Sequence, residues 1–221
     1  RAAAQIAQCG HYHHPVLDTP GWWARDGRFL RGGECATPTT ARRAAAPLLI
    51  TGATGTLGRA FASICTQRGL DHILTSRAEL DMTDPLAIDR AINCYRPWAV
   101  VNAAGFVRVA EAEALAERCF AENALGPELL AKACARHDLP LVTFSSDLVF
   151  DGAQDRPYLE TDATNPLCLY GQSKSAAEQR VSAAWEKSLI IRTSAFFGPW
   201  DRYNFVWNTQ IGRASCRERV S

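Results

Sequence analysis

The chain has 221 residues and a formal net charge of +1, with 47% hydrophobic and 21% charged residues. These values are typical of a globular protein with one domain, or one domain plus a fragment. They give no electrostatic reason to expect nucleic acid or an anionic membrane as a partner. No apolar run reaches the roughly 18 residues of a transmembrane helix.

The N-terminal part shows no sustained hydrophobic period. Because the chain begins at Arg1, without an initiator methionine or a signal-peptide pattern, we expect a fragment in which residues 1–46 are the end of an upstream region plus a linker. His11, His13 and His14 are crowded together without carboxylates or thiols at ligand spacing, so no metal site is predicted.

The eight cysteines form no C-x-x-C pair, which indicates reduced thiols and a cytoplasmic protein.

From Pro47 onward, short apolar segments alternate with segments of helical period. The expected strands are 47–50, 72–75, 98–101, 141–144 and 189–191. The expected helices are 59–68, 85–95, 111–120, 126–137 and 171–187. This alternation predicts an α/β fold, a doubly wound parallel sheet of the Rossmann type with helices on both faces.

A glycine-rich turn follows the first expected strand directly. Gly52, Gly55 and Gly58 are spaced G-x-x-G-x-x-G, with Thr56 and Leu57 between the last two. Glycines here allow a tight turn, a close approach of backbone N–H groups to a pyrophosphate, and packing of the helix on the strand. The helix N-terminus then faces the negative charge, so the loop predicts a dinucleotide cofactor.

The end of the second strand indicates which dinucleotide is bound. A carboxylate there would bind a ribose 2′-hydroxyl, but this chain has Ser76 and Arg77 and no carboxylate until Glu79. A hydroxyl donor and a guanidinium suit a 2′-phosphate, so we expect NADP(H). The alternative is that Arg77 is only a solvated loop charge.

Tyr170 and Lys174 lie four residues apart on an expected helix and therefore share one face. The fourth expected strand leads into Ser145 and Ser146, and the carboxyl ends of parallel strands face the cofactor crevice. A phenol has an ordinary pKa near 10, and a neighbouring ammonium is expected to lower it for proton exchange with a carbonyl oxygen. We predict catalytic roles for Ser146, Tyr170 and Lys174. The alternative is a half-buried aromatic and a surface charge.

Together these residues resemble the extended short-chain dehydrogenase/reductase superfamily, and more closely the dTDP-4-dehydrorhamnose reductase family. The resemblance covers about residues 47–210. Besides the glycine loop and the Tyr170–Lys174 motif, it rests on 80–84, 101–105, 144–152 and 192–194. It implies NADPH-linked reduction of a 4-keto-6-deoxysugar on a nucleotide carrier, as in dTDP-rhamnose biosynthesis.

The resemblance also implies roles for single residues. Asp81 and Met82 match the segment beside the adenine, and Asn123 matches an active-site asparagine of the superfamily. The strand end that lines the cofactor corresponds to Ala103, Ala104 and Gly105. Tyr170 and Lys174 also contact the cofactor in this interpretation, and Arg192 to Ser194 border the nicotinamide and the substrate.

The chain departs from the family pattern at two places. Ala110 stands where the family commonly has an Asp that would cap a helix with Glu113 at its third position. Family members continue past residue 210 into a small domain that holds the sugar, so we expect this substrate domain to be largely missing. Residues 211–221 resemble a translated sequencing adapter and are expected to be a non-native tail, although an ordinary basic tail is an alternative.

Two other functions fit the same residues. One is a nucleotide-sugar epimerase or dehydratase, although Leu148 stands after Asp147 where a dehydratase needs Glu. The other is a non-catalytic NADP-binding regulatory subunit. Further expectations are a nucleotide-sugar substrate, a homodimer and an upstream glycosidase-like domain.

Overall fold

The computed structural model describes residues 46–196. They form a parallel five-stranded sheet in the order β2-β1-β3-β4-β5. The strands are β1 (Leu48–Thr51), β2 (His72–Thr75), β3 (Ala99–Asn102), β4 (Leu141–Ser146) and β5 (Ser188–Thr193). Every residue of β1 and β3 is buried, as expected for apolar strands at the centre of a parallel sheet. The α/β prediction is confirmed.

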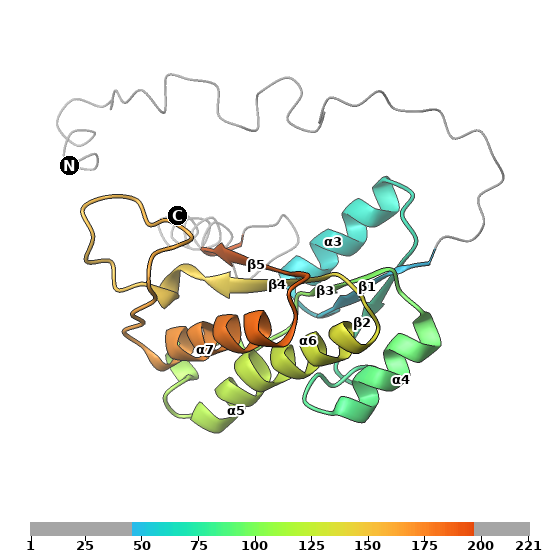
Figure 1. Cartoon of the computed structure of the whole chain (residues 1–221), viewed down its shortest axis with the longest axis horizontal. Helices are drawn as coiled ribbons and strands as arrows, with labels where there is room; N and C mark the ends of the chain where they lie inside the picture. Colours follow the sequence, from blue (N-terminus) through green and yellow to red (C-terminus); the bar gives the residue numbers. More distant parts are fainter. Residues whose placement is uncertain (1–45, 197–221) are drawn as a thin grey trace, which may run out of the picture. The chain divides into compact units, whose positions relative to one another are not determined.

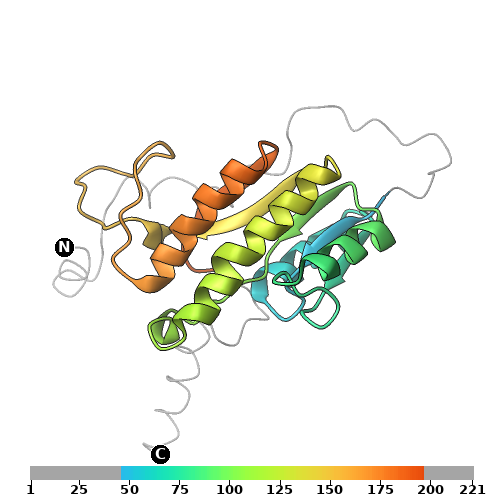
Figure 2. The same cartoon turned by 60° about the horizontal axis from the view of Figure 1, so that its bottom comes forward.

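The helices lie on both faces of this sheet (Figure 1). They are α3 (Thr56–Gln67), α4 (Pro85–Tyr95), α5 (Ala116–Phe120), α6 (Gly126–Arg136) and α7 (Leu169–Ala184). Helix α3 covers one face, whereas α4, α6 and α7 cover the other, with α6 and α7 side by side in Figures 1 and 2.

Successive residues of the central strands supply two separate cores, because side chains alternate between the faces of a strand. Leu49 and Val100 pack with Ile88, Leu130 and Val181 of the three-helix layer. Leu48, Ile50 and Val101 pack with Phe61 and Cys65 of α3. The sheet is therefore anchored on both faces around β1 and β3.

Local signals explain why α4 begins and ends where the sequence predicts. The Asp84 side chain accepts a hydrogen bond of 2.9 Å from the Leu86 N–H, and Pro85 occupies the first helical position. At the other end Arg96 adopts the left-handed conformation, with φ of 46°.

The predicted helix 111–120 is wrong in its first half. A short 3-10 turn, η2 (Val109–Glu111), is followed by loop residues, and α5 is one short helix that runs through a π-helical turn, η3 (Ala121–Leu125), into α6. The first residues lack the capping that would start a long helix, because the η2 and α5 N-termini have no side-chain cap among the described residues.

The chain leaves β1 toward β2 on one side and leaves the neighbouring strand β3 toward β4 on the other, so the connections from β1 and β3 run in opposite directions. Such a switch point opens a crevice at the carboxyl ends of the strands, where ligands of open α/β sheets bind. Within residues 46–196, no helix is long and apolar enough to cross a membrane. The histidine cluster, the region before residue 46 and the tail 211–221 lie outside the described residues.

Candidate active site

The glycine loop leaves no space for side chains on the strand side. Gly52 has φ of +90°, and a Cβ built on it would lie 2.7 Å from the Ala103 carbonyl oxygen. A Cβ on Gly58 would collide with the Gly52 carbonyl oxygen. The Gly55 N–H closes the turn with a 3.0 Å hydrogen bond to that same oxygen. The loop is therefore a tight backbone cradle, as a pyrophosphate site requires.

The N-terminus of α3 opens into this cradle. Its first residues, Thr56 and Leu57, are half-buried, and their N–H groups have no partner within the helix. No described side chain caps this end, and its first turn holds no acidic residue. A free helix N-terminus without a nearby carboxylate favours an anion.

Buried polar side chains join the carboxyl ends of β1, β3 and β4. The Thr51 hydroxyl donates to the Asn102 side-chain oxygen at 2.8 Å, and the Asn102 amide donates to the Thr143 hydroxyl at 3.1 Å. The Ala104 N–H bonds to the Thr51 hydroxyl at 3.2 Å. Thr51, Asn102 and Thr143 were not among the predicted site residues; the polar groups that end otherwise apolar strands were the available signal.

Asn123 lies in the π-helical turn and is fully buried, with 1% of its surface exposed. Its side-chain oxygen accepts a 2.8 Å hydrogen bond from the Phe106 N–H, and its amide donates to the Ser173 hydroxyl at 3.1 Å. That hydroxyl also accepts from the Cys119 thiol at 3.3 Å and donates to the Tyr170 carbonyl oxygen at 2.7 Å. Asn123 therefore connects the loop after β3 to the first turn of α7.

Lys174 reaches the same loop. A Cβ on Gly105 would lie 2.8 Å from the Asn123 side-chain oxygen and 3.7 Å from the Lys174 ammonium nitrogen. This nitrogen donates to the Phe144 carbonyl oxygen at 3.1 Å and lies 5.9 Å from the centre of the Tyr170 ring. Burial lowers the pKa of Lys174 to about 8.

The expectation that Lys174 lowers the pKa of Tyr170 is wrong for this structure. Burial, assisted by the nearby ionisable groups Cys119 and Asp147, raises the pKa of Tyr170 to about 12. Desolvation disfavours the phenolate, and Lys174, itself desolvated, donates a hydrogen bond to the Phe144 carbonyl oxygen. At neutral pH Tyr170 is therefore a phenol that holds its proton.

Ser146 occupies the end of β4 and is buried. Its hydroxyl donates to the Asp147 carboxylate at 3.0 Å and accepts from the Leu148 N–H at 3.1 Å. A Cβ on Gly171 would collide with the Leu148 carbonyl oxygen, so the start of α7 lies directly against the turn that carries Ser146. The neighbouring Ser145 hydroxyl is buried and has no partner among the described residues.

The end of β2 lies beside the glycine loop, because the Thr75 carbonyl oxygen accepts hydrogen bonds of 3.0 Å from the Gly52 and Ala53 N–H groups. Ser76 and Arg77 follow at this place. The Ser76 hydroxyl donates to Glu79 at 2.8 Å, and Arg77 is 2.6 Å from Glu122. Both groups predicted to bind a 2′-phosphate are thus hydrogen-bonded to carboxylates.

The two residues predicted to lie beside the adenine, Asp81 and Met82, have different surroundings. Asp81 accepts from the Thr83 N–H and hydroxyl at 2.9 and 2.7 Å and pairs with Arg77 at 3.3 Å. These bonds to Thr83, the largest influence, lower the pKa of Asp81. The Met82 side chain is buried in the core beside α6, where a Cβ on Gly126 would lie 3.2 Å from its own Cβ.

Comparison with known proteins gives the family. Residues 46–221 match the family described as RmlD substrate binding domain. The chain belongs to this family.

Two relatives carry the same name. The dTDP-4-dehydrorhamnose reductase of Aggregatibacter actinomycetemcomitans is 38% identical over 174 residues, covering 78% of this chain and 58% of that protein. The protein of the same name in Mycobacterium tuberculosis (strain ATCC 25618 / H37Rv) is 40% identical over 151 residues, covering 66% of this chain and 49% of that protein. The chain therefore spans about half to three-fifths of the length of these relatives.

A solved structure of a protein with the same name is also similar to this chain. The crystal structure of dTDP-4-dehydrorhamnose reductase from Bacillus anthracis in complex with NADP superimposes with a TM-score of 0.74 at 28% identity, covering 79% of this chain and 62% of that one.

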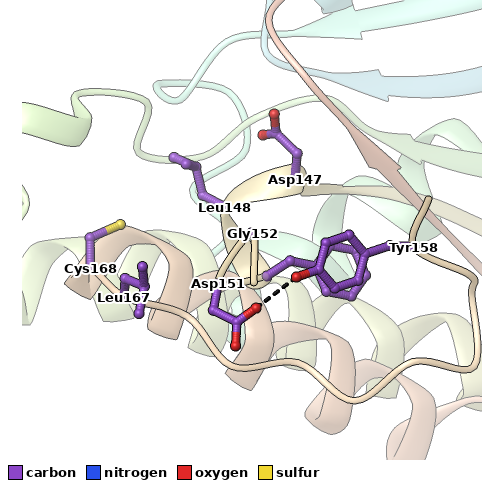
Figure 3. Close-up of a pocket in the computed structure, with 8 residues that line it drawn as sticks. Asp147, Leu148, Asp151, Gly152, Tyr158, Leu167 and Cys168 are labelled. Atoms are coloured by element: carbon purple, nitrogen blue, oxygen red, sulfur yellow. Dashed lines mark hydrogen bonds between the residues drawn. The ribbon is translucent and has the colours of Figure 1, made fainter. Parts of the chain in front are cut away.

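In this member of the RmlD substrate binding domain family, a pocket of about 370 Å³ lies beside the Ser146 turn (Figure 3). Its apolar lining comes from Leu148, Phe150 and Leu167, and its polar lining includes Asp147, Asp151, Tyr158 and Cys168. The Phe150 and Tyr158 rings are stacked at 4.0 Å.

Asp151 is held in place at this pocket by several donors. The Tyr158 hydroxyl donates to it at 2.6 Å and the Asn165 amide at 2.9 Å, and these bonds lower the pKa of Asp151 to about 2. No group of three or more His, Cys, Asp or Glu side chains within residues 46–196 is arranged to hold a metal ion.

Two more residues lie near the start of α7 and the pocket. Glu113, for which no capping box was expected because Ala110 replaces the capping Asp, has a carboxylate that accepts a 3.2 Å hydrogen bond from the Leu169 N–H at the start of α7. The Arg192 guanidinium, expected to border the nicotinamide and the substrate, lies beside a ring that lines the pocket. It makes hydrogen bonds of 2.9 and 2.7 Å to Glu178 and stacks 4.8 Å from the centre of the Phe150 ring.

Proposed function

We propose that this chain is the cofactor-binding part of an NADPH-dependent reductase that acts on a nucleotide-linked 4-keto-6-deoxysugar. The relatives named dTDP-4-dehydrorhamnose reductase and the related structure with NADP support this proposal. Because the chain spans only part of those proteins, the activity and the substrate are proposed for the whole protein.

One observation of this structure carries the proposal. The short segment after β3 touches both halves of the site: a Gly52 Cβ would meet Ala103, and a Gly105 Cβ would meet Lys174. A phosphate cradle and a buried ammonium are thus held on one strand end, at the switch point of the sheet.

The residues of the site fit NADP(H). The cradle would hold the pyrophosphate at the N–H groups of α3, and the end of β2 would hold the adenine ribose. The proposed cofactor residues are Gly52, Gly55, Thr56, Leu57, Gly58, Ser76, Arg77, Asp81, Met82, Ala103, Ala104, Gly105, Asn123, Tyr170 and Lys174. When bound, NADPH supplies a hydride to a carbonyl carbon.

The proposed proton donor is Tyr170. A phenol whose pKa is about 12 keeps its proton at pH 7 and can donate it to a carbonyl oxygen that gains negative charge. Lys174 remains mostly an ammonium below its pKa of about 8 and would stabilise that charge and the cofactor ribose. Ser146 would release Asp147 and donate its hydrogen bond to the carbonyl.

The pocket beside Ser146 is the proposed place of the sugar. Asp147 in its lining follows Ser146, and Cys168 in its lining precedes Tyr170 by two residues. Stacked aromatic rings and a fixed carboxylate suit the apolar face and the hydroxyls of a sugar ring.

One observation favours the non-catalytic alternative, an NADP-binding regulatory subunit. The Ser146 hydroxyl, which catalysis needs as a donor to substrate, is bound to Asp147. The epimerase alternative shares the same residues and differs in its product. Loss of NADPH that depends on a ketone distinguishes a reductase from both.

We also propose that residues 47–210 form the NAD(P)-binding domain, with an upstream region before them and a non-native tail at 211–221. The alternation of strands and helices from Leu48 to Thr193 supports the first of these boundaries. A homodimer, an upstream glycosidase-like domain and a cytoplasmic location are further proposals.

The first test is a titration of the chain with NADPH, followed by nicotinamide fluorescence. Gly52→Ala should abolish binding, because its Cβ has no space and its φ is positive. Gly152→Ala is the matched control, since Gly152 also has a positive φ, +72°, but nothing lies within 4 Å of its Cβ position. If the folded unmodified chain fails to bind NADPH, the cofactor proposal is refuted.

The second test uses a protein extended to the full length of its relatives. Oxidation of NADPH by a dTDP-linked 4-keto-6-deoxysugar should be lost in Tyr170→Phe, whereas NADPH binding should persist. Normal turnover by this variant would contradict the role of Tyr170. NADPH binding without turnover by the unmodified protein would favour the regulatory alternative.

A further inference from the structure

We propose that Glu122 is a specificity-determining residue of the adenine-ribose end of the cofactor site: its carboxylate competes with a 2′-phosphate for Arg77 and so limits the preference for NADPH over NADH. This inference rests on the proposed function, because it assumes that the dinucleotide lies on the glycine loop.

The position of Arg77 follows from the backbone around the loop. Thr75, two residues earlier, accepts hydrogen bonds from Gly52 and Ala53 and so holds the end of β2 against the cradle. In dinucleotide-binding folds the residues that follow this strand contact the 2′ position of the adenine ribose. Arg77 is therefore the cation that a 2′-phosphate would meet first.

Carboxylates already bind two nitrogens of Arg77 and both donors of Ser76. Arg77 lies 2.6 Å from Glu122 and 3.3 Å from Asp81. The Ser76 N–H and hydroxyl both donate to Glu79, at 2.7 and 2.8 Å. A 2′-phosphate can bind these donors only after they have left their present acceptors, or by sharing them.

The charges in this cluster do not favour an added anion. The second cation, Arg118, also binds Glu122, at 2.7 Å. Two guanidinium groups therefore stand against three carboxylates, those of Glu79, Asp81 and Glu122. A phosphate with about two negative charges would bind to a cluster that has no net positive charge. The 2′-hydroxyl of NADH is neutral, so the net charge of the cluster has little effect on its binding.

Among the three carboxylates, Glu122 should affect binding of the 2′-phosphate most, because its side chain is more buried than that of Arg77. Its side chain is 14% exposed and extends from the π-helical turn, next to the buried Asn123, whereas the Arg77 side chain is 57% exposed. Burial tends to raise the pKa of Glu122, but the hydrogen bonds and charges of Arg118 and Arg77 outweigh it and lower that pKa. Glu122 is thus ionised at neutral pH and stays beside the ribose end.

The test is to measure dissociation constants for NADPH and NADH with the unmodified chain and with Glu122→Gln, which keeps the size of the side chain and removes its charge. NADPH should bind about fivefold more tightly to the variant, the upper range for an exposed ion pair. NADH should change by less than about twofold. Adenosine 2′,5′-bisphosphate and ADP, which lack the nicotinamide, should show the same contrast.

Glu128→Gln is the matched control. Glu128 also pairs with two cations, Lys132 at 2.6 Å and Arg180 at 3.2 Å, and is 20% exposed, but it lies on α6 and has no contact with Arg77. Its replacement should leave the ratio of the two dissociation constants unchanged. Thermal melting of each variant verifies that it is folded.

A second measurement covers the case in which Glu122→Gln does not fold. Glu79→Ala removes the acceptor of both Ser76 donors instead and should shift the ratio toward NADPH by a smaller factor. The inference is overturned if the variants leave the ratio unchanged or shift it toward NADH, since Glu122 would then position Arg77 rather than compete for it. Failure of the unmodified chain to bind either dinucleotide would overturn the proposed function as well.

Discussion

The two ends of the candidate cofactor site are built from different interactions. Around Asn123, buried polar groups bind one another with little exposure to water, over distances of 2.7 to 3.1 Å. Around Arg77, exposed charges share partners, and both guanidinium groups bind the same Glu122 oxygen. The first arrangement fixes geometry, because an unmade bond is costly there. The second adjusts affinity, because exposed ion pairs can be exchanged at low cost.

The largest expected effect on stability comes from removing the buried hydrogen bonds of Asn123. Asn123→Ala leaves the Phe106 N–H and one bond of Ser173 unsatisfied in a buried region, so the free energy of unfolding should fall by about 3 kcal/mol. Urea unfolding measures this. Asn165→Ala, which removes an exposed amide with one bond to Asp151, is the control and should cost less than about 1 kcal/mol. If both substitutions lowered the free energy of unfolding equally, the buried hydrogen bonds of Asn123 would contribute no more to stability than an exposed one.

An intermediate effect depends on pH. The pKa of Lys174 is about 8 in the folded chain and near 10.5 when unfolded, so below pH 8 the folded state carries a buried charge at a cost. Between pH 8 and 10.5 the unfolded state binds more protons than the folded state, and the free energy of unfolding therefore rises with pH.

From pH 7.5 to 9.5 this gain should be about 2 kcal/mol relative to Lys174→Met, which has no proton to lose. Urea unfolding of both proteins at the two pH values gives the difference. The same pH dependence in the unmodified chain and in Lys174→Met would contradict the buried charge. Tyr170, whose pKa is raised to about 12, acts only above pH 10 and in the opposite direction.

The smallest effect is expected at the exposed end. Arg77→Ala removes two ion pairs but should change the free energy of unfolding by less than about 1 kcal/mol, because the Arg77 side chain is 57% exposed and its charges are screened. Urea unfolding at low and high salt tests this. A loss as large as that of Asn123→Ala would remove the contrast between the two ends.

The features that the sequence predicted well are local ones. An apolar run followed by Gly52, Gly55 and Gly58 specifies strand, loop and helix within a dozen residues. Asp84 and Pro85 fix the start of α4 in the same way. The distribution of site residues over the carboxyl ends of the strands then follows from the rules of parallel sheets.

The features that it missed depend on residues far apart in the chain. Glu113 bonds to Leu169, 56 residues away, and Arg77 to Glu122, 45 residues away. The direction of the pKa shift of Tyr170 depends on burial by several elements, which a pattern of residue types does not give. Nor does a helical period reveal the π-helical turn in which Asn123 is buried, because the hydrogen-bond spacing of such a turn differs from that of an α-helix by only one residue.

The backbone amide of Phe106 makes the buried network observable. Phe106 lies outside every strand and helix, in a stretch where an amide proton would ordinarily exchange quickly with solvent water. Its proton is instead held by the Asn123 side chain, and the residue is 3% exposed. Exchange at this one amide should therefore be as slow as in the central strands, and deuterium uptake there would report when the turn that carries Asn123 separates from the segment after β3 without unfolding of the whole domain.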